Sequence, residues 1–172
     1  MEKTNLALVL MLSFGIFLFV QTSQAQNKPE KPPKPIKLTV YTLQHLEFGR
    51  IIPMGSPGYV TVPPSGVPTS NSVILLSSPA RTPAIIDVES LPGTRIQIGF
   101  PSSVTLTCSG VGTLNLRDLT CEPGGLSHSF ISDAGGNTRV YIGGTLDVNL
   151  ISVNPAGSYG GTFTVTFTQI YQ

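Results

Sequence analysis

Short segments in which apolar and polar residues alternate run through most of this chain. The clearest lies at the end, where Phe163, Val165 and Phe167 alternate with threonines at positions 162, 164, 166 and 168. A strand with this period of two buries one row of side chains and exposes the other. We therefore predict a C-terminal β-strand whose three large apolar side chains face the core.

The same alternation occurs in at least three other places, and each predicts a strand with one buried face. The apolar rows are Ile36, Leu38 and Val40; Ile96, Ile98 and Phe100; and Leu146, Val148 and Leu150. Shorter strand candidates such as "GYVTVPP", "VILLSS", "AIIDVESL" and "VTLTC" lie between clusters of Gly, Pro, Ser and Asn. Eight or more short strands separated by such turn-forming residues predict an all-β antiparallel sandwich or barrel.

The first residues have the layout of a secretory signal peptide. One lysine precedes an apolar block from Leu6 to Val20, and small residues follow at Ser23 and Ala25. We expect cleavage after Ala25, so that residues 1–25 are the signal peptide. A membrane anchor is the alternative, although the block is shorter than the roughly 20 residues that span a bilayer. On the first interpretation no transmembrane anchor remains after cleavage.

Residues 26–35 form a leader rich in proline and lysine, with four prolines in the ten residues "QNKPEKPPKP". Each proline lacks a backbone donor and restricts the residue before it, so we expect an extended, exposed tether. Residues 36–172 then form one β-sandwich domain. The whole chain has a formal net charge of only +1, and this low charge gives no electrostatic footprint for nucleic acid.

Cys108 and Cys121 are the two cysteines of the chain. In an oxidising compartment we expect them to form a disulfide, which would contribute roughly 3 kcal/mol to stability in the chain-entropy model. Two free thiols are the alternative. No histidine or further cysteine lies near them at ligand spacing, so we expect no metal site.

The ionisable side chains are too few and too scattered to predict an enzyme. His45 and His128 are the two histidines, and no Gly-x-Ser-x-Gly motif occurs. Asp87 and Glu89 point the same way on a strand, which suggests a solvated face, with a cation site or acid/base pair as the alternative. Asp133 opens "DAGGN", which we interpret as a hairpin turn and not a calcium loop. We expect no catalytic residue and no cofactor.

Several motifs, in their order and spacing, resemble one secreted bacterial family. They are "LEFGRI", "GYVTVPPSG", "SLPGTRIQIGFPSSVTL", "YIGGTLDV" and "PAGSYGGTFTVTFTQIY". This part of the chain, roughly Ile36 to Gln172, is similar to the family catalogued as domain of unknown function 4402. Membership implies an exported β-sandwich with no established activity.

The end of the chain also resembles the last strand of chaperone–usher pilins. Phe163, Val165 and Phe167 supply the alternation, Gly160 or Gly161 the upstream glycine, and Tyr171 the tyrosine next to the last residue. The resemblance implies an immunoglobulin-like β-sandwich that is completed by the N-terminal strand of the next subunit. Here that donor would carry Ile36, Leu38 and Val40.

We therefore expect an exported structural or adhesive subunit, secreted or at the cell surface after passage through the periplasm. Its partners would be copies of itself and a secretion chaperone. The alternative is a monomeric secreted module that binds carbohydrate or protein through exposed tyrosines. The candidates for such a surface are Tyr59, Tyr141, Tyr159 and Tyr171.

Overall fold

The computed structural model describes residues 37–40, for which only the backbone is considered, together with residues 44–108 and 112–170. These ranges fold into strands without a helix, so the prediction of an all-β fold is confirmed. Within them, no helix has the length and apolar character needed to cross a membrane. The strands are β1 (Lys37–Val40), β2 (Ile51–Pro53), β3 (Gly58–Val62), β4 (Thr69–Asn71), β5 (Val73–Leu75), β6 (Ala84–Glu89), β7 (Arg95–Gly99), β8 (Ser103–Thr107), β9 (Thr113–Glu122), β10 (Ser129–Ile131), β11 (Asn137–Val148) and β12 (Thr166–Ile170).

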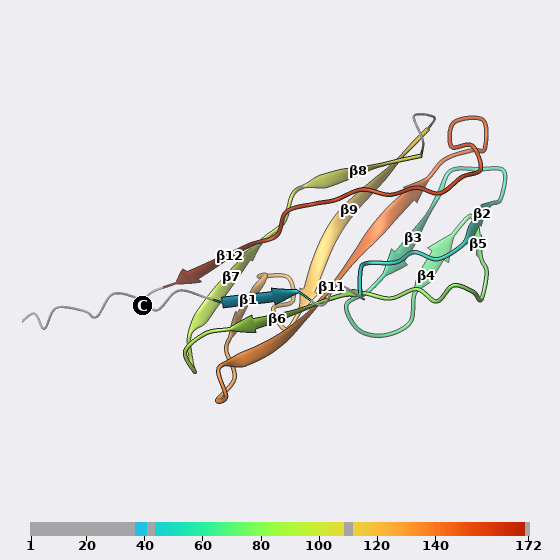
Figure 1. Cartoon of the computed structure of the whole chain (residues 1–172). Coiled ribbons are helices and arrows are strands. Elements are labelled where there is room, and N and C mark those ends of the chain that lie inside the picture. Colours follow the sequence, from blue (N-terminus) through green and yellow to red (C-terminus); the bar gives the residue numbers. More distant parts are fainter. Residues whose placement is uncertain (1–36, 41–43, 109–111, 171–172) are drawn as a thin grey trace, which may run out of the picture. The chain divides into compact units, whose positions relative to one another are not determined.

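The largest sheet has seven strands and is organised around β11, the longest strand (Figure 1). On one side β11 pairs with β9, which pairs in turn with β8. On the other side the first half of β11 pairs with β6 and the second half with β3. β1 lies outside β6, and β4 lies outside β3. All of these pairings are antiparallel, as the sequence pattern predicted.

A second sheet contains β10, β7 and β12, and β2 pairs with β5 in a third. β7 and β8 follow each other closely in the chain but belong to different sheets. The C-terminal segment runs antiparallel to both. The backbones of Thr107 and Gly160 exchange hydrogen bonds of 2.9 and 3.0 Å, and farther on β12 pairs with β7 from Thr166↔Gly99 to Ile170↔Arg95. This segment therefore spans from the edge of the large sheet to the edge of the small one.

The buried side chains follow the predicted alternation in most strands. Ile96 and Ile98 are buried, whereas Phe100 is half-buried because β7 ends one residue before it. Leu146 and Val148 are also buried. Leu150 was predicted to be buried and is 36% exposed, because β11 ends at Val148.

Gly143 allows β11 to change partners. A Cβ atom there would lie 2.2 Å from the carbonyl oxygen of Val62, closer than real Cβ contacts permit. The register between β9 and β11 also shifts between Gly143 and Thr145, which marks a β-bulge at this glycine pair.

The turn predicted at Asp133 is present, since the amide of Gly136 donates to the Asp133 carbonyl at 2.8 Å. It is not a hairpin, however. The turn connects β10 to β11, and these two strands belong to different sheets.

The predicted disulfide between Cys108 and Cys121 is not formed, and both thiols are buried and free. Cys108 directly follows Thr107, which pairs with Thr113 at the start of β9. Cys121 lies eight residues farther along β9, or roughly 25 Å away at the rise of an extended strand. A disulfide needs Cα atoms within about 7 Å of each other, so the register of β8 and β9 keeps the two cysteines apart.

Candidate functional site

Residues 160–170, here called the C-terminal edge, form an edge that lacks a partner on its outer side among the strands that the structure describes. Phe163, Val165 and Phe167 are half-buried and pack against the core. The threonines at positions 162, 164, 166 and 168 are exposed, so the predicted alternation is confirmed. The apolar row thus faces the core without being fully covered by it.

The C-terminal edge also lacks the devices that usually prevent sheet edges from pairing with other chains. Such edges carry charged residues, proline or bulges, or are very short. Residues 160–170 contain neither a charged residue nor a proline. The edge strands β4 and β10, by contrast, have only three residues each, and β1 begins with Lys37. The edge strand β8 is also uncharged, and the C-terminal segment bridges it at Thr107. The C-terminal edge is therefore well suited to accept another strand.

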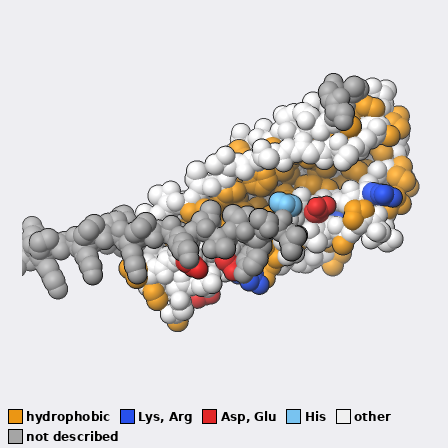
Figure 2. All heavy atoms as spheres, viewed as in Figure 1, with side chains coloured by type: hydrophobic (Ala, Val, Ile, Leu, Met, Phe, Trp, Pro, Cys, Tyr) orange, Lys and Arg blue, Asp and Glu red, His pale blue; other side chains and the backbone are white. Residues whose placement is uncertain are grey.

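A band of hydrophobic side chains is visible on one face of the domain (Figure 2). In the view shared with Figure 1, the band follows the course of the C-terminal segment. The core is also bordered by other partly buried apolar residues, among them Leu46, Ile51, Leu75, Leu106 and Tyr159. Apolar surface therefore reaches solvent on the face that carries the C-terminal edge.

The predicted donor segment forms β1, the outermost strand of the large sheet beside β6. Its backbone pairs with β6 of the same chain, with Leu38 opposite Val88 and Val40 opposite Ile86. Four residue pairs hold it there. Ile36 and Tyr171, also predicted to take part in assembly, lie outside the described residues.

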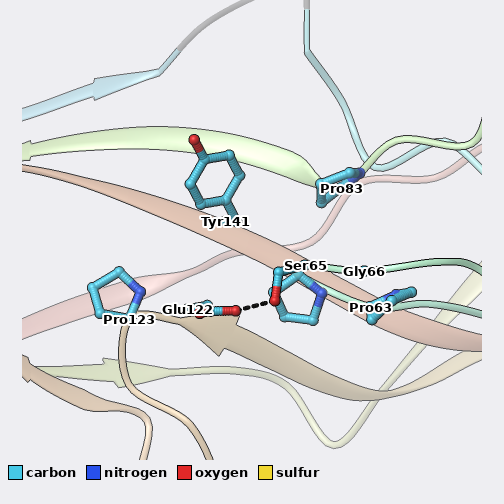
Figure 3. Close-up of a pocket in the computed structure, with 8 residues that line it drawn as sticks. Pro63, Ser65, Gly66, Pro83, Glu122, Pro123 and Tyr141 are labelled. Carbon is cyan, nitrogen blue, oxygen red and sulfur yellow. Dashed lines mark hydrogen bonds between the residues drawn. The ribbon is translucent and has the colours of Figure 1, made fainter.

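A pocket of about 570 Å³ lies where β3 and β6 both leave β11 (Figure 3). Pro63 directly follows β3 and Pro83 directly precedes β6. Because proline has no amide hydrogen, it cannot continue either ladder. The prolines that end these two strands therefore also form walls of the pocket.

The remaining lining residues come from β9, β11 and the loop after β3. Tyr141 of β11 lies opposite Glu122 of β9, and Pro123 follows Glu122. The hydroxyl of Ser65 donates a hydrogen bond to the Glu122 carboxylate, as the dashed line in Figure 3 shows. The pocket thus joins proline rings and one tyrosine ring to a single acidic side chain. Sequence reasoning missed it because these prolines signalled only strand ends.

The tyrosines proposed for ligand binding do not form one cluster. Tyr59 lies opposite Asp147, six residues along β11 from Tyr141, or roughly 20 Å away. Tyr159 donates from its hydroxyl to the carbonyl of Pro155 at 2.7 Å. Desolvation raises the pKa of this hydroxyl above its usual value.

Tyr59 is 40% exposed and lies opposite Asp147, whose carboxylate accepts hydrogen bonds from other polar side chains. Arg117 donates from Nε to both carboxylate oxygens of Asp147, at 2.9 and 3.0 Å, and Asn115 donates to the same carboxylate at 3.2 Å. The hydrogen bond to Asp147 raises the pKa of Arg117.

Two of the residues considered for catalysis, Asp87 and His128, contact other side chains of the domain. Asp87 was predicted to lie on a solvated face but is only 6% exposed, and Arg139 donates to it from Nε at 2.9 Å. The ring of His128 packs edge-on against Phe100. Among the described residues, no group of three or more His, Cys, Asp or Glu side chains is placed to hold a metal ion.

These features define an antiparallel all-β domain with an open apolar edge and a proline-lined pocket. Residues 38–168 match the family described as a domain of unknown function, DUF4402, and the chain belongs to this family. Searches of curated proteins and of solved structures found no match. The family resemblance predicted from the sequence is therefore confirmed.

Proposed function

We propose that this chain is an exported, non-catalytic structural subunit of the cell surface that assembles in the manner of a pilin. A signal peptide at residues 1–25 directs its export through the periplasm. The described sheets then form an immunoglobulin-like sandwich with an incomplete edge, and a strand from a second copy completes it. A secretion chaperone covers the same edge before assembly. The mechanism is strand addition, which needs no cofactor.

The observation that carries this proposal is the combination of features at the C-terminal edge. Its backbone has no described partner on the outer side, and residues 160–170 bear no charge or proline that would oppose pairing. The row of Phe163, Val165 and Phe167 remains half-buried. An added strand would gain main-chain hydrogen bonds and cover this row, which are the two contributions that drive strand addition.

The donor in this proposal is the N-terminal segment of a second copy, with Ile36, Leu38 and Val40 as its apolar row. Within one chain, β1 occupies an outer position on β6 through only four residue pairs. Exchange of such a short terminal element between identical chains is a low-cost route to association. The isolated chain is then self-paired, and assembly moves β1 to the C-terminal edge of a neighbour.

The test is detergent gel electrophoresis of the native surface fraction, with and without boiling, using an antibody to this chain. We expect a heat-labile ladder at multiples of the subunit mass. Deletion of residues 26–40 should abolish the ladder and leave a domain that is unstable or depends on a chaperone. A deletion product that forms the same oligomers would rule out donation by this segment.

The polar surroundings of Tyr59 support a second candidate, a monomeric module that binds carbohydrate or protein. An exposed aromatic ring beside Asp147, Asn115 and Arg117 offers both a stacking surface and hydrogen-bonding groups. This candidate predicts a single monomer band with and without boiling. It also predicts that Tyr59→Ala reduces binding to a glycan array, whereas the assembly proposal predicts no change.

A further inference from the structure

The proline-lined pocket has no role in strand addition, yet it combines rings and charge in a way that suits one segment of this chain. We propose that the pocket binds the leader, residues 26–35, of a second copy. This inference rests on the proposed function in that it names a second contact between assembling copies. The binding itself does not depend on pairing at the C-terminal edge.

The leader sequence has a period of three. Prolines stand at positions 29, 32 and 35 and lysines at positions 28, 31, 34 and 37, while the fourth proline, Pro33, falls outside these two series. A polyproline II helix has three residues per turn, so in that conformation the prolines form one ridge and the lysines form the next. Proline-rich segments favour this conformation, which loses little entropy on binding.

The pocket offers a complementary surface to these two ridges. Proline-rich helices dock in grooves lined by aromatic side chains, and here Tyr141 lies among Pro63, Pro64, Pro83 and Pro123. The lysine ridge finds an acidic partner in Glu122, whose carboxylate accepts a hydrogen bond from Ser65. The cavity of about 570 Å³ also lies within the size range of ligand pockets.

The direction of β1 favours the leader of a second copy over the chain's own leader. β1 is antiparallel to β6, so Lys37 lies opposite Glu89, at the end of β6 remote from Pro83 and the pocket. The six residue steps from Pro83 to Glu89 span roughly 20 Å. The start of β1, from which the chain's own leader continues, therefore lies far from the pocket, whereas the leader of a second copy can approach the pocket from solvent.

The experiment is a fluorescence anisotropy titration of a labelled synthetic peptide, residues 26–36, with the mature full-length protein. We expect saturable binding that weakens as salt is added, because the lysine ridge contributes. Tyr141→Ala should weaken binding about tenfold, a typical loss for an aromatic anchor, whereas Tyr141→Phe should retain it. Glu122→Gln should weaken it about threefold, as for an exposed ion pair. Ile151→Ala removes an apolar side chain that is 65% exposed and does not line the pocket, so it is the control and should bind as the wild type does.

Two peptides test the period of three. One has alanine at positions 29, 32 and 35, and the other has the same composition with the prolines moved out of that period. We expect both to bind much more weakly than the native sequence. Equal binding of all three peptides would show attraction by charge alone and overturn the proposal, as would no binding by the wild-type protein or unchanged binding by Tyr141→Ala.

A failure of leader binding can be distinguished from a failure of strand addition. A variant whose C-terminal edge is blocked, such as Thr164→Lys with Thr168→Lys, should still bind the peptide. Loss of the detergent-resistant ladder with intact peptide binding would place a failure in strand addition alone. An intact ladder without peptide binding would refute only the leader site.

Discussion

Opposite charges placed at the same two positions of the C-terminal edge test strand addition directly. Thr164 and Thr168 are exposed and belong to the face opposite the apolar row. If Ile36, Leu38 and Val40 of a donor face the core, Lys37 and Thr39 of that donor share the outer face with these threonines. Lysines at positions 164 and 168 would then repel Lys37, whereas glutamates would attract it.

The magnitude follows from cross-strand pair energies. Side chains opposite each other lie about 4.5–5.5 Å apart, and a charged pair changes pairing by roughly 0.2–1 kcal/mol. Lys37 is the donor's one charge on this face and can lie opposite only one of the two positions, so the substitutions change the association free energy by up to about 1 kcal/mol, or about fivefold in the association constant. We expect Thr164→Lys with Thr168→Lys to weaken assembly and the corresponding double glutamate variant to maintain or strengthen it. The difference should shrink at high ionic strength.

The assay combines sedimentation velocity of the purified variants with the unboiled detergent gel. A double glutamine variant is the neutral control for side-chain size. Urea unfolding should give free energies within about 0.5 kcal/mol of the wild type, because the positions are on the surface. If both charged variants unfold as the wild type does and form identical ladders, then this edge does not receive the donor strand.

Four further predictions concern the fold itself. Mass spectrometry after denaturation and alkylation should find two free thiols, and native labelling of Cys121 should be slow because burial raises its pKa to about 11. Since the native state then holds a proton that the unfolded chain releases above its ordinary pKa of 9.0, stability should fall as the pH rises from about 9 to 11, measured by urea unfolding. Gly143→Val should destabilise the domain by about 3 kcal/mol or more in the same assay, because its Cβ would meet the backbone of Val62. Arg139→Gln should cost about 1–2 kcal/mol, between the values for an exposed and a buried ion pair, because Asp87 is buried while Arg139 is half exposed; a loss below about 0.5 kcal/mol would refute this account of Asp87.

The sequence predicted the strands well wherever one face is buried and the other is exposed. Ile96, Ile98 and Phe167 show this, because one-sided burial leaves a period of two in the residues themselves. Phe163 and Val165 keep the alternation but lie before β12, which begins at Thr166. The prediction failed at Leu150, where the alternation continues in the sequence past the end of β11. Alternation reports which way a side chain would point, but not where the last hydrogen-bonded partner lies.

The local sequence pattern did not predict which strands pair with one another over long distances in the chain. β11 takes two successive partners on one side, β6 and β3, and no local pattern indicates this exchange. The same limit explains Cys108 and Cys121, whose proximity in sequence suggested a bridge that the register of β8 and β9 prevents. The burial of Asp87 depends on Arg139, fifty-two positions away. The pocket likewise needs prolines from three separate parts of the chain.

The apolar row at the C-terminal edge raises the question of why such an edge persists. In a monomer that acted alone, a charge or proline in residues 160–170 would lower the risk of aggregation at little cost, since the outer face is exposed. The other edges show that this chain uses such protection elsewhere, with short strands at β4 and β10. The C-terminal edge instead combines an uncharged backbone edge with a row of half-buried apolar side chains, and this combination favours pairing with a specific partner. Strand addition by a second copy, after release from a chaperone, meets that requirement.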